Sequence, residues 1–275
     1  MLVPDVSRLA TLLPPLRGDE RFSLNITAYL DRINYRGSLL PTAETLRALQ
    51  VAHLLAVPFE NLSIHAKEPI VLEDEALFTK IVERRRGGFC YECNGLFAAL
   101  LRALGFNVAM LSAEVANAAG VFGPAFDHMT LMVSLEQRWL VDVGFGDSFR
   151  EPLRLDEQHE QLQGRRAYCI LHNDPYLVLS QRNDGDEWKP QHRFTLQPHE
   201  YADYDEMCRY HQTSPESHFT QGRICSLATN EGRISLSGMR FITTTENGEK
   251  EGRNLASEAE HDAILAERFG IVMTS

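Results

Sequence analysis

Apolar residues in the first hundred positions recur at spacings of three and four, which is the period of one face of an α-helix. This pattern predicts helices over residues 25–33, 42–55 and 75–85. A further helix is predicted over residues 93–104, where Gly105 supplies the expected end. The region up to about residue 105 is therefore predicted to be a helical bundle.

The pattern changes after Gly105 to short runs of apolar and branched residues. Runs at 129–135 and 139–145 flank the polar residues 136–138, which predicts a β-hairpin, with Asp142 inside its second strand. Strands are also expected at 167–171 and 176–181, and the turn-forming residues 183–186 lead into another hairpin. Residues 106–198 are predicted to form an antiparallel sheet or barrel.

The remaining residues, 199–275, mix both patterns. A helix is predicted at 200–211, and strands at 223–228 and 233–237 flank a turn at 230–232. Ser257 and Glu260 have the spacing of a capping box, which opens a last helix ending at Gly270. Helices first, then strands, then a mixed region indicate an α+β fold and not an alternating parallel-sheet fold.

Composition narrows the functional classes. The chain of 275 residues is 44% hydrophobic and 24% charged, as in globular proteins, with a net charge of −11. Its negative surface disfavours nucleic acid and anionic membranes as partners. No apolar run is long enough to span a membrane, and Pro4, Asp5 and Arg8 do not fit a signal peptide. The five cysteines are an odd number, which indicates reduced thiols, so we expect a cytoplasmic protein. The sequence leaves open whether it is a monomer or a homo-oligomer.

The segment most informative about chemistry is RRRGGFCYECNG at 84–95. Its glycines allow a tight turn before a helix, so Cys90 is expected at or just before the helix N-terminus, where free N–H groups and the helix dipole favour a thiolate. The same N–H groups are suited to holding an oxyanion. Alternatively, Cys90 is a small buried hydrophobe, or forms with Cys93 a redox pair or half of a zinc site. Zinc needs two more ligands, and no second close pair is present, so no metal site is predicted.

A cysteine nucleophile works best with a base and a group that orients the base. His128 opens an apolar strand after a loop marked by glycine and proline, which makes it a candidate base. Asp142 lies in an otherwise apolar run, where a carboxylate is costly without a partner such as an imidazole N–H. With a turn at 136–138, however, His128 and Asp142 are offset by about four residues, roughly 13 Å. The two are expected to meet only with twist or a bulge.

Together these motifs resemble the arylamine N-acetyltransferase family. The family signature around its nucleophile matches RGGFCYECN at 86–94, and the histidine and aspartate strands match at 128–129 and 142–146. Further ordered matches are YLDRI at 29–33, PFENL at 58–62, SPESHF at 214–219 and SGMR at 237–240.

The resemblance implies a Cys90–His128–Asp142 triad in a three-part fold: a helical domain at 1–105, a β-barrel at 106–198 and an α/β lid at 199–275. It also implies acetyl-coenzyme A as a co-substrate, no permanently bound cofactor, and an aromatic amine or hydrazine as acceptor, in ping-pong order. By the same resemblance Phe59, Phe145 and Phe219 line the acceptor pocket, and Gly146 lets the coenzyme approach the backbone. Arg86 is expected to pair with Glu60 and fix the nucleophile loop.

The chain departs from the family pattern at three places. Cys93 replaces a glutamine, Asp127 stands beside His128 where a small polar residue near the coenzyme is usual, and the first twenty or so residues precede the usual start. Asp127 is expected to raise the basicity of His128 or to weaken coenzyme binding. Three rival functions remain open: an amide synthase or an enzyme for propionyl or malonyl thioesters, a cysteine hydrolase or transglutaminase-like enzyme, and a non-catalytic redox or binding protein.

Overall fold

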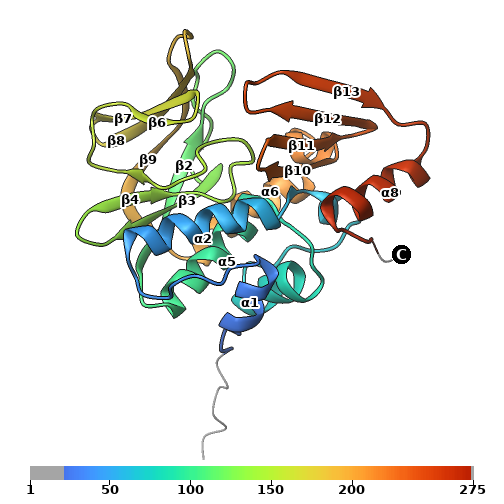
Figure 1. The fold of residues 1–275 in the computed structure, drawn as a ribbon, viewed down its shortest axis with the longest axis horizontal. Coiled ribbons are helices and arrows are strands. Elements are labelled where there is room, and N and C mark those ends of the chain that lie inside the picture. The colour runs from blue at the N-terminus through green and yellow to red at the C-terminus, as the bar shows by residue number, and fades with distance from the viewer. Residues whose placement is uncertain (1–21, 274–275) are drawn as a thin grey trace, which may run out of the picture.

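A layer of helices lies beneath two antiparallel sheets in the computed structural model, which describes residues 22–273 (Figure 1). Sequence arguments based on Pro4, Asp5, Arg8 and the first twenty residues lie outside these described residues. The two sheets stand side by side above the helices, and α2 crosses in front of both (Figure 1). The predicted α+β class, with a helical bundle, a barrel and an α/β unit, is confirmed.

Two helices of the first part, α1 and α2, begin where a side chain satisfies a free N–H group. Asn25 accepts from Ala28 N, and Thr42 accepts from Thr45 N. The helices of the first part are α1 (Ile26–Arg32), α2 (Ala43–Ala56), α3 (Leu62–His65), α4 (Asp74–Phe78), the π-helix η1 (Thr79–Glu83) and α5 (Cys90–Ala103). The single helix predicted at 75–85 is wrong in its second half, because the chain widens into η1, where Arg84 N donates to Thr79 O, five residues back.

Eight strands form the first sheet, a nearly closed barrel in the order β5-β4-β3-β2-β9-β8-β7-β6. Its two end strands are joined through side chains. Gln161 Oε1 accepts from Arg154 N at 2.7 Å, and Gln163 Nε2 donates to Glu151 O at 2.7 Å. The strands are β2 (Asn107–Val115), β3 (His128–Ser134), β4 (Arg138–Val141), β5 (Leu153–Arg154), β6 (Gln161–Gln163), β7 (Arg166–Asn173), β8 (Tyr176–Asn183) and β9 (Lys189–His199).

The hairpin of β3 and β4 differs from its prediction in two ways. Leu131 pairs with Val141 and Ser134 with Arg138, so the turn lies one residue earlier than expected. Continuing this register puts Asp142 opposite Thr130, only two residues from His128 on the same face, where diagonal neighbours can touch. The prediction that Asp142 lies inside a strand is also wrong, because β4 ends at Val141 and the chain turns toward the helices.

The second sheet has the order β1-β10-β11-β12-β13. Its first strand comes from the helical part of the sequence, since Phe59 of β1 pairs with Ser226 of β10. The helix α8 packs on this sheet, beginning at Ser257, whose side chain accepts from Glu260 N, and ending at Gly270 with φ +68°. The elements are β1 (Phe59–Glu60), α6 (Tyr201–Thr213), α7 (His218–Gln221), β10 (Ile224–Thr229), β11 (Gly232–Ser237), β12 (Arg240–Thr245), β13 (Lys250–Asn254) and α8 (Glu258–Phe269).

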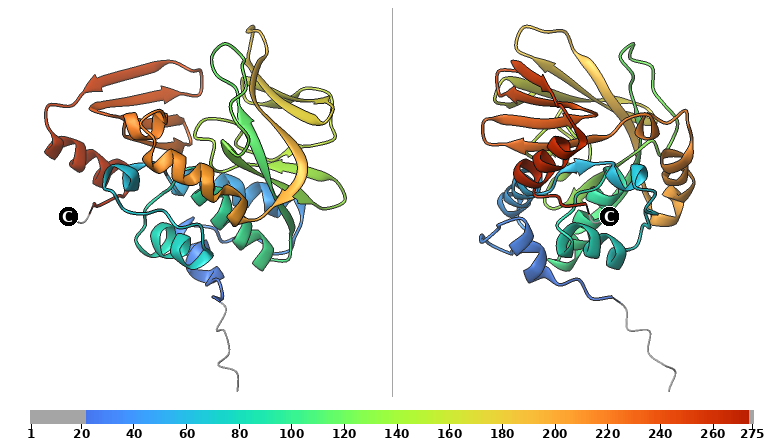
Figure 2. Two further views of the ribbon diagram at one scale, coloured as in Figure 1. Left: turned by 180° about the vertical axis from the view of Figure 1, so that it is seen from behind. Right: turned by 90° about the vertical axis from the view of Figure 1, so that its right-hand side faces the viewer.

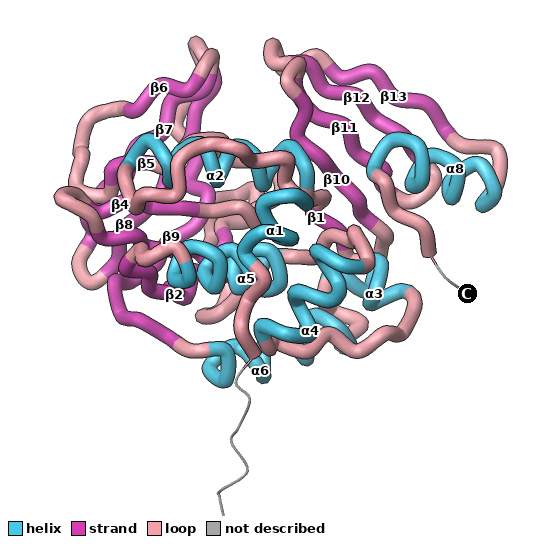
Figure 3. The backbone as a smooth tube through the Cα atoms, turned by 60° about the horizontal axis from the view of Figure 1, so that its bottom comes forward, coloured by secondary structure: helices cyan, strands magenta, loops and turns pink. Residues whose placement is uncertain are grey.

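Three apolar cores hold these parts together. The largest surrounds α5, which is buried along most of its length and packs against β2 and β3. The second fills the barrel, and the third lies between the C-terminal sheet and α8. The helix α6 lies across the back of the helical layer (Figure 2), and α4 and α6 lie at the end away from β12 and β13 (Figure 3). The boundaries predicted at 105 and 198 stay predictions.

Within residues 22–273 no helix is long and apolar enough to cross a membrane.

Candidate active site

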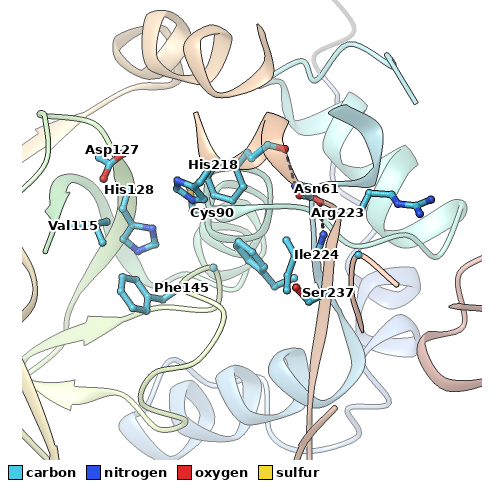
Figure 4. Close-up of a pocket in the computed structure, with 15 residues that line it drawn as sticks. Asn61, Cys90, Val115, Asp127, His128, Phe145, His218, Arg223, Ile224 and Ser237 are labelled. Carbon is cyan, nitrogen blue, oxygen red and sulfur yellow. Dashed lines mark hydrogen bonds between the residues drawn. The ribbon is translucent and has the colours of Figure 1, made fainter. Parts of the chain in front are cut away.

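A cavity of about 580 Å³ lies between the barrel and the C-terminal sheet (Figure 4). Cys90 and His128 both line it, although they are 38 positions apart in the sequence and lie on different elements. Its other lining residues are Phe59, Asn61, Val115, Asp127, Gly144, Phe145, His218, Phe219, Gly222, Arg223, Ile224, Ser237 and Gly238. The cavity is therefore walled by all three parts of the chain.

Cys90 is the first residue of α5 and is 3% exposed. The predicted helix start at residue 93 is thus three residues late, whereas the expectation that Cys90 stands at a helix N-terminus is confirmed. The glycines before it permit close packing, since a Cβ at Gly87 would come 1.9 Å from Pro58 O and one at Gly88 2.6 Å from Glu92 Cβ. Gly88 bonds Pro58 and Glu60 through its backbone, which fixes the loop against β1.

The helix N-terminus alone does not give Cys90 the lowered pKa expected from the sequence. Burial raises the pKa of the Cys90 thiol well above its usual value, and the charge of Asp127 adds to that effect. A hydrogen bond from the backbone N–H of Met129 opposes the rise but does not cancel it. The same bond places the sulfur beside the first residues of β3. Ionisation of Cys90 therefore needs a base that takes the proton.

His128 and Asp142 are in direct contact. His128 Nε2 lies 2.6 Å from Asp142 Oδ2, and both side chains are buried. Burial alone raises the pKa of the Asp142 carboxyl, but His128, His192 and the hydrogen bond from Asn94 outweigh it, so the pKa falls below its usual value. The carboxylate therefore remains charged and holds Nε2–H. This orientation leaves His128 Nδ1 for a second partner.

Asn94 is a residue of the site that the sequence reasoning did not single out. It lies one helical turn after Cys90 and is fully buried. Its amide nitrogen donates to Asp142 Oδ1 at 2.9 Å and to Met129 O at 2.6 Å, and its Oδ1 accepts from Val143 N at 2.8 Å. Asn94 thus ties the nucleophile helix to β3 and to the segment that follows β4. The signal in the sequence was the spacing of four from Cys90.

Gly144 is a second residue that was missed. A Cβ there would lie 2.8 Å from Cys90 Cα and 2.7 Å from Asn94 Nδ2, and its N–H donates to Asp142 Oδ1 at 2.8 Å. Only glycine lets the segment after β4 lie this close to α5.

The predicted pairing of Arg86 with Glu60 is confirmed. The guanidinium lies 2.9 Å from the Glu60 carboxylate, and both are buried. A second buried carboxylate, Glu92, accepts from Lys80 Nζ at 2.6 Å and from Phe89 N at 3.1 Å. These bonds brace the backbone immediately before Cys90.

The three phenylalanines expected at an acceptor pocket all line the cavity. Phe59 and Phe219 have ring centroids 6.2 Å apart, and Phe145 packs edge-on against the His128 ring at 5.1 Å. Gly146 is not among the residues that line the cavity. Its backbone φ of +89° explains why a glycine stands there. A Cβ at this position would lie 3.7 Å from the Phe59 ring. The role expected of Gly146 toward a coenzyme stays a prediction.

Cys93 is buried and points away from the cavity, with its Sγ donating to Gly88 O at 3.1 Å. Burial raises the pKa of its thiol well above the usual value.

All five cysteines are free, and within residues 22–273 no group of three or more His, Cys, Asp or Glu side chains is placed to hold a metal ion.

Three further histidines surround the site. His192 packs against the His128 ring at 5.4 Å, and burial, followed by the charge of His128, lowers its pKa to about 3. His218 lines the cavity, and burial also lowers its pKa. His211, buried behind it, has Nε2 3.3 Å from Asp127 Oδ1. Only their place in the fold, not a sequence pattern, identifies them.

Comparison with known proteins finds relatives over most of the chain. A family model described as N-acetyltransferase matches residues 42–275. The chain is 36% identical to an arylamine N-acetyltransferase of Mycolicibacterium smegmatis over 90% of this chain and 92% of that one. It is 35% identical to that of Escherichia coli, covering 88% and 87%.

Solved structures give the same result. The arylamine N-acetyltransferase of Mycobacterium marinum superposes with a TM-score of 0.83 at 35% identity, covering 90% of this chain and 93% of that one. The Salmonella typhimurium enzyme superposes with a TM-score of 0.85 at 29% identity, covering 91% and 92%. Another similar structure is the Mycobacterium marinum enzyme in complex with CoA. From its fold, its site and these relatives, the chain belongs to the arylamine N-acetyltransferase family of acyltransferases.

Proposed function

We propose that the protein transfers an acetyl group from acetyl-coenzyme A to the nitrogen of an arylamine or arylhydrazine, through a thioester on Cys90. The observation that carries this proposal is the buried His128–Asp142 hydrogen bond beside a helix-terminal cysteine in one cavity. Family membership supports the reaction class, and the CoA complex of the Mycobacterium marinum relative supports the donor.

In the first half-reaction His128 Nδ1 accepts the proton of the Cys90 thiol while the sulfur attacks the thioester carbonyl. Asp142 keeps the proton on Nε2 and stabilises the imidazolium that forms. Since burial opposes a free thiolate, proton transfer accompanies the attack. Collapse of the tetrahedral intermediate expels the coenzyme thiolate, which takes the proton from His128.

The N–H groups at the start of α5 are proposed to hold the oxyanion. The Phe89 N–H is already bonded to the Glu92 carboxylate. The N–H groups of the first residues of α5 then remain as donors for the carbonyl on Cys90.

In the second half-reaction an uncharged amine enters after coenzyme A has left and attacks the acetyl carbon. His128 accepts its proton, and the Cys90 sulfur leaves and recovers a proton. Conversion of a thioester to an amide is downhill, whereas the first exchange of one thioester for another is nearly balanced. Aromatic amines suit this step because they are neutral at pH 7 and can pack on Phe59, Phe145 and Phe219.

The test compares Cys90→Ala with Cys93→Ala, which changes a buried thiol that faces away from the cavity. Acetylation of an aniline is expected to vanish in Cys90→Ala and to persist in Cys93→Ala, with unchanged circular dichroism in both. Aniline acetylation by folded Cys90→Ala near the wild-type rate ends the proposal. Free acetate as the main product favours a hydrolase. Faster acylation by propionyl- or malonyl-coenzyme A favours the other acyl donors.

A further inference from the structure

The charged groups of the cavity are few. Among the described residues that line it, Asp127 carries the single carboxylate and Arg223 the single guanidinium. Both nitrogens at the end of Arg223 are bonded to Glu258, at 2.8 Å each. His218 also lines the cavity, but burial and its neighbour His211 lower its pKa below the usual range, so it is neutral at pH 7.

In the described part of the chain Asp127 has one basic neighbour within ion-pair distance. Its nearest basic group is His211, with Nε2 3.3 Å from Asp127 Oδ1. The Ser217 hydroxyl lies 3.1 Å from His211 Nδ1, and its oxygen accepts from Phe219 N, so its proton can point at Nδ1. Asp127 is thus the one carboxylate among the described residues that line the cavity.

We propose that Asp127 selects acceptors by charge, disfavouring arylamines that carry a carboxylate and favouring those with a neutral or cationic ring substituent. Asp127 directly precedes His128 and faces the same cavity as Cys90, so the ring of a bound acceptor lies within reach of its field (Figure 4). The charge of Asp127 also contributes to the raised pKa of Cys90, which indicates that it acts at the reacting atom. At a separation of about 8 Å and an effective dielectric of about 20, repulsion between two carboxylates changes binding by roughly tenfold or more.

This inference rests on the proposed acetyl transfer and names the substrate class of the same site. The probes are 4-aminobenzoate and 4-aminobenzamide, which have nearly the same shape and differ in charge. In a ping-pong reaction kcat/KM for the acceptor reports only the second half-reaction, so effects of a variant on coenzyme binding do not enter the comparison. An uncharged donor such as 4-nitrophenyl acetate gives a second check.

The wild type is expected to prefer the benzamide, and Asp127→Asn is expected to reduce the benzamide-to-benzoate ratio of kcat/KM roughly tenfold. Glu258→Gln removes the partner of Arg223 and is expected to move the ratio in the same direction. The matched control is Asp156→Asn, which neutralises a half-exposed carboxylate paired with Arg138 on the barrel surface and should leave the ratio unchanged. An unchanged ratio in Asp127→Asn overturns the inference while leaving acetyl transfer intact. Failure of the wild type to acetylate either probe and a panel of other anilines overturns the proposed function instead.

Discussion

Replacing Asn94 by alanine separates the support of the triad from the triad itself. Asn94 is fully buried, and its side chain makes three hydrogen bonds, to Asp142, to Met129 O and from Val143 N. In Asn94→Ala the buried Val143 N–H and Met129 carbonyl lose this partner, and Asp142 Oδ1 loses one of its two donors.

The magnitude follows from these losses. An unsatisfied buried polar group costs about 1–3 kcal/mol, so the losses at Val143 N and Met129 O together are expected to lower the free energy of unfolding by about 2–6 kcal/mol. Asp142 keeps its bond from Gly144 N, so His128 retains a partner in a less fixed position. A displacement of about 1 Å at a catalytic group costs on the order of 100-fold in rate, so kcat/KM should fall by 10- to 100-fold.

Urea unfolding and steady-state kinetics measure the two effects. The control is Asn183→Ala, which removes an exposed asparagine whose side chain bonds Asp186 at 2.9 Å and should change the free energy of unfolding by less than about 0.5 kcal/mol. If Asn94→Ala matches Asn183→Ala in both stability and kcat/KM, the account of Asn94 as the support of Asp142 is refuted.

Three further outcomes are expected. Gly144→Ala should lose about 1–3 kcal/mol of stability and most of its activity, because the added Cβ would lie 2.8 Å from Cys90 Cα. Gly222→Ala has open space at its Cβ and should keep its free energy of unfolding in the same assay. Arg86→Met should lower the unfolding free energy by about 3–5 kcal/mol because it leaves the buried Glu60 carboxylate with Lys80, 4.0 Å away, as its remaining cation, while Arg138→Met on the surface should cost less than about 1 kcal/mol. His192 has a folded-state pKa of about 3, below its unfolded value of 6.5, so the unfolded chain binds more protons between these values and acidification destabilises the protein. In pH-dependent urea unfolding, His192→Gln should remove up to about 1.4 kcal/mol per pH unit of that loss; an unchanged slope contradicts the assignment.

The sequence predicted the elements whose patterns are local. Apolar periodicity predicted α2, the spacing of Ser257 and Glu260 predicted the start of α8, and the glycine at 105 marked the end of α5. The strands β12 and β13 were missed because their residues are largely polar, and pairing with β11 holds them in place. Likewise β1 is two residues long and owes its strand geometry to β10, which lies far along the chain.

The candidate site was predicted in its residues but not in its geometry. Motif matching selected Cys90, His128 and Asp142, yet the assumed turn placed the last two about four residues out of register. The hairpin turns one residue earlier, and Asp142 leaves the strand, because Asn94 and Gly144 hold it against α5. Such contacts join segments about fifty positions apart, so periodicity and propensity contain no information about them.

The central claim is that Cys90 carries the acetyl group between donor and acceptor. The most direct measurement is mass spectrometry of the protein mixed with acetyl-coenzyme A alone, with peptide mapping of the adduct. The account predicts one acetyl group on Cys90, none on Cys93, and loss of the adduct with formation of an amide when an arylamine is added. Acetyl transfer that proceeds without any adduct on Cys90, or an adduct that persists in Cys90→Ala, contradicts it.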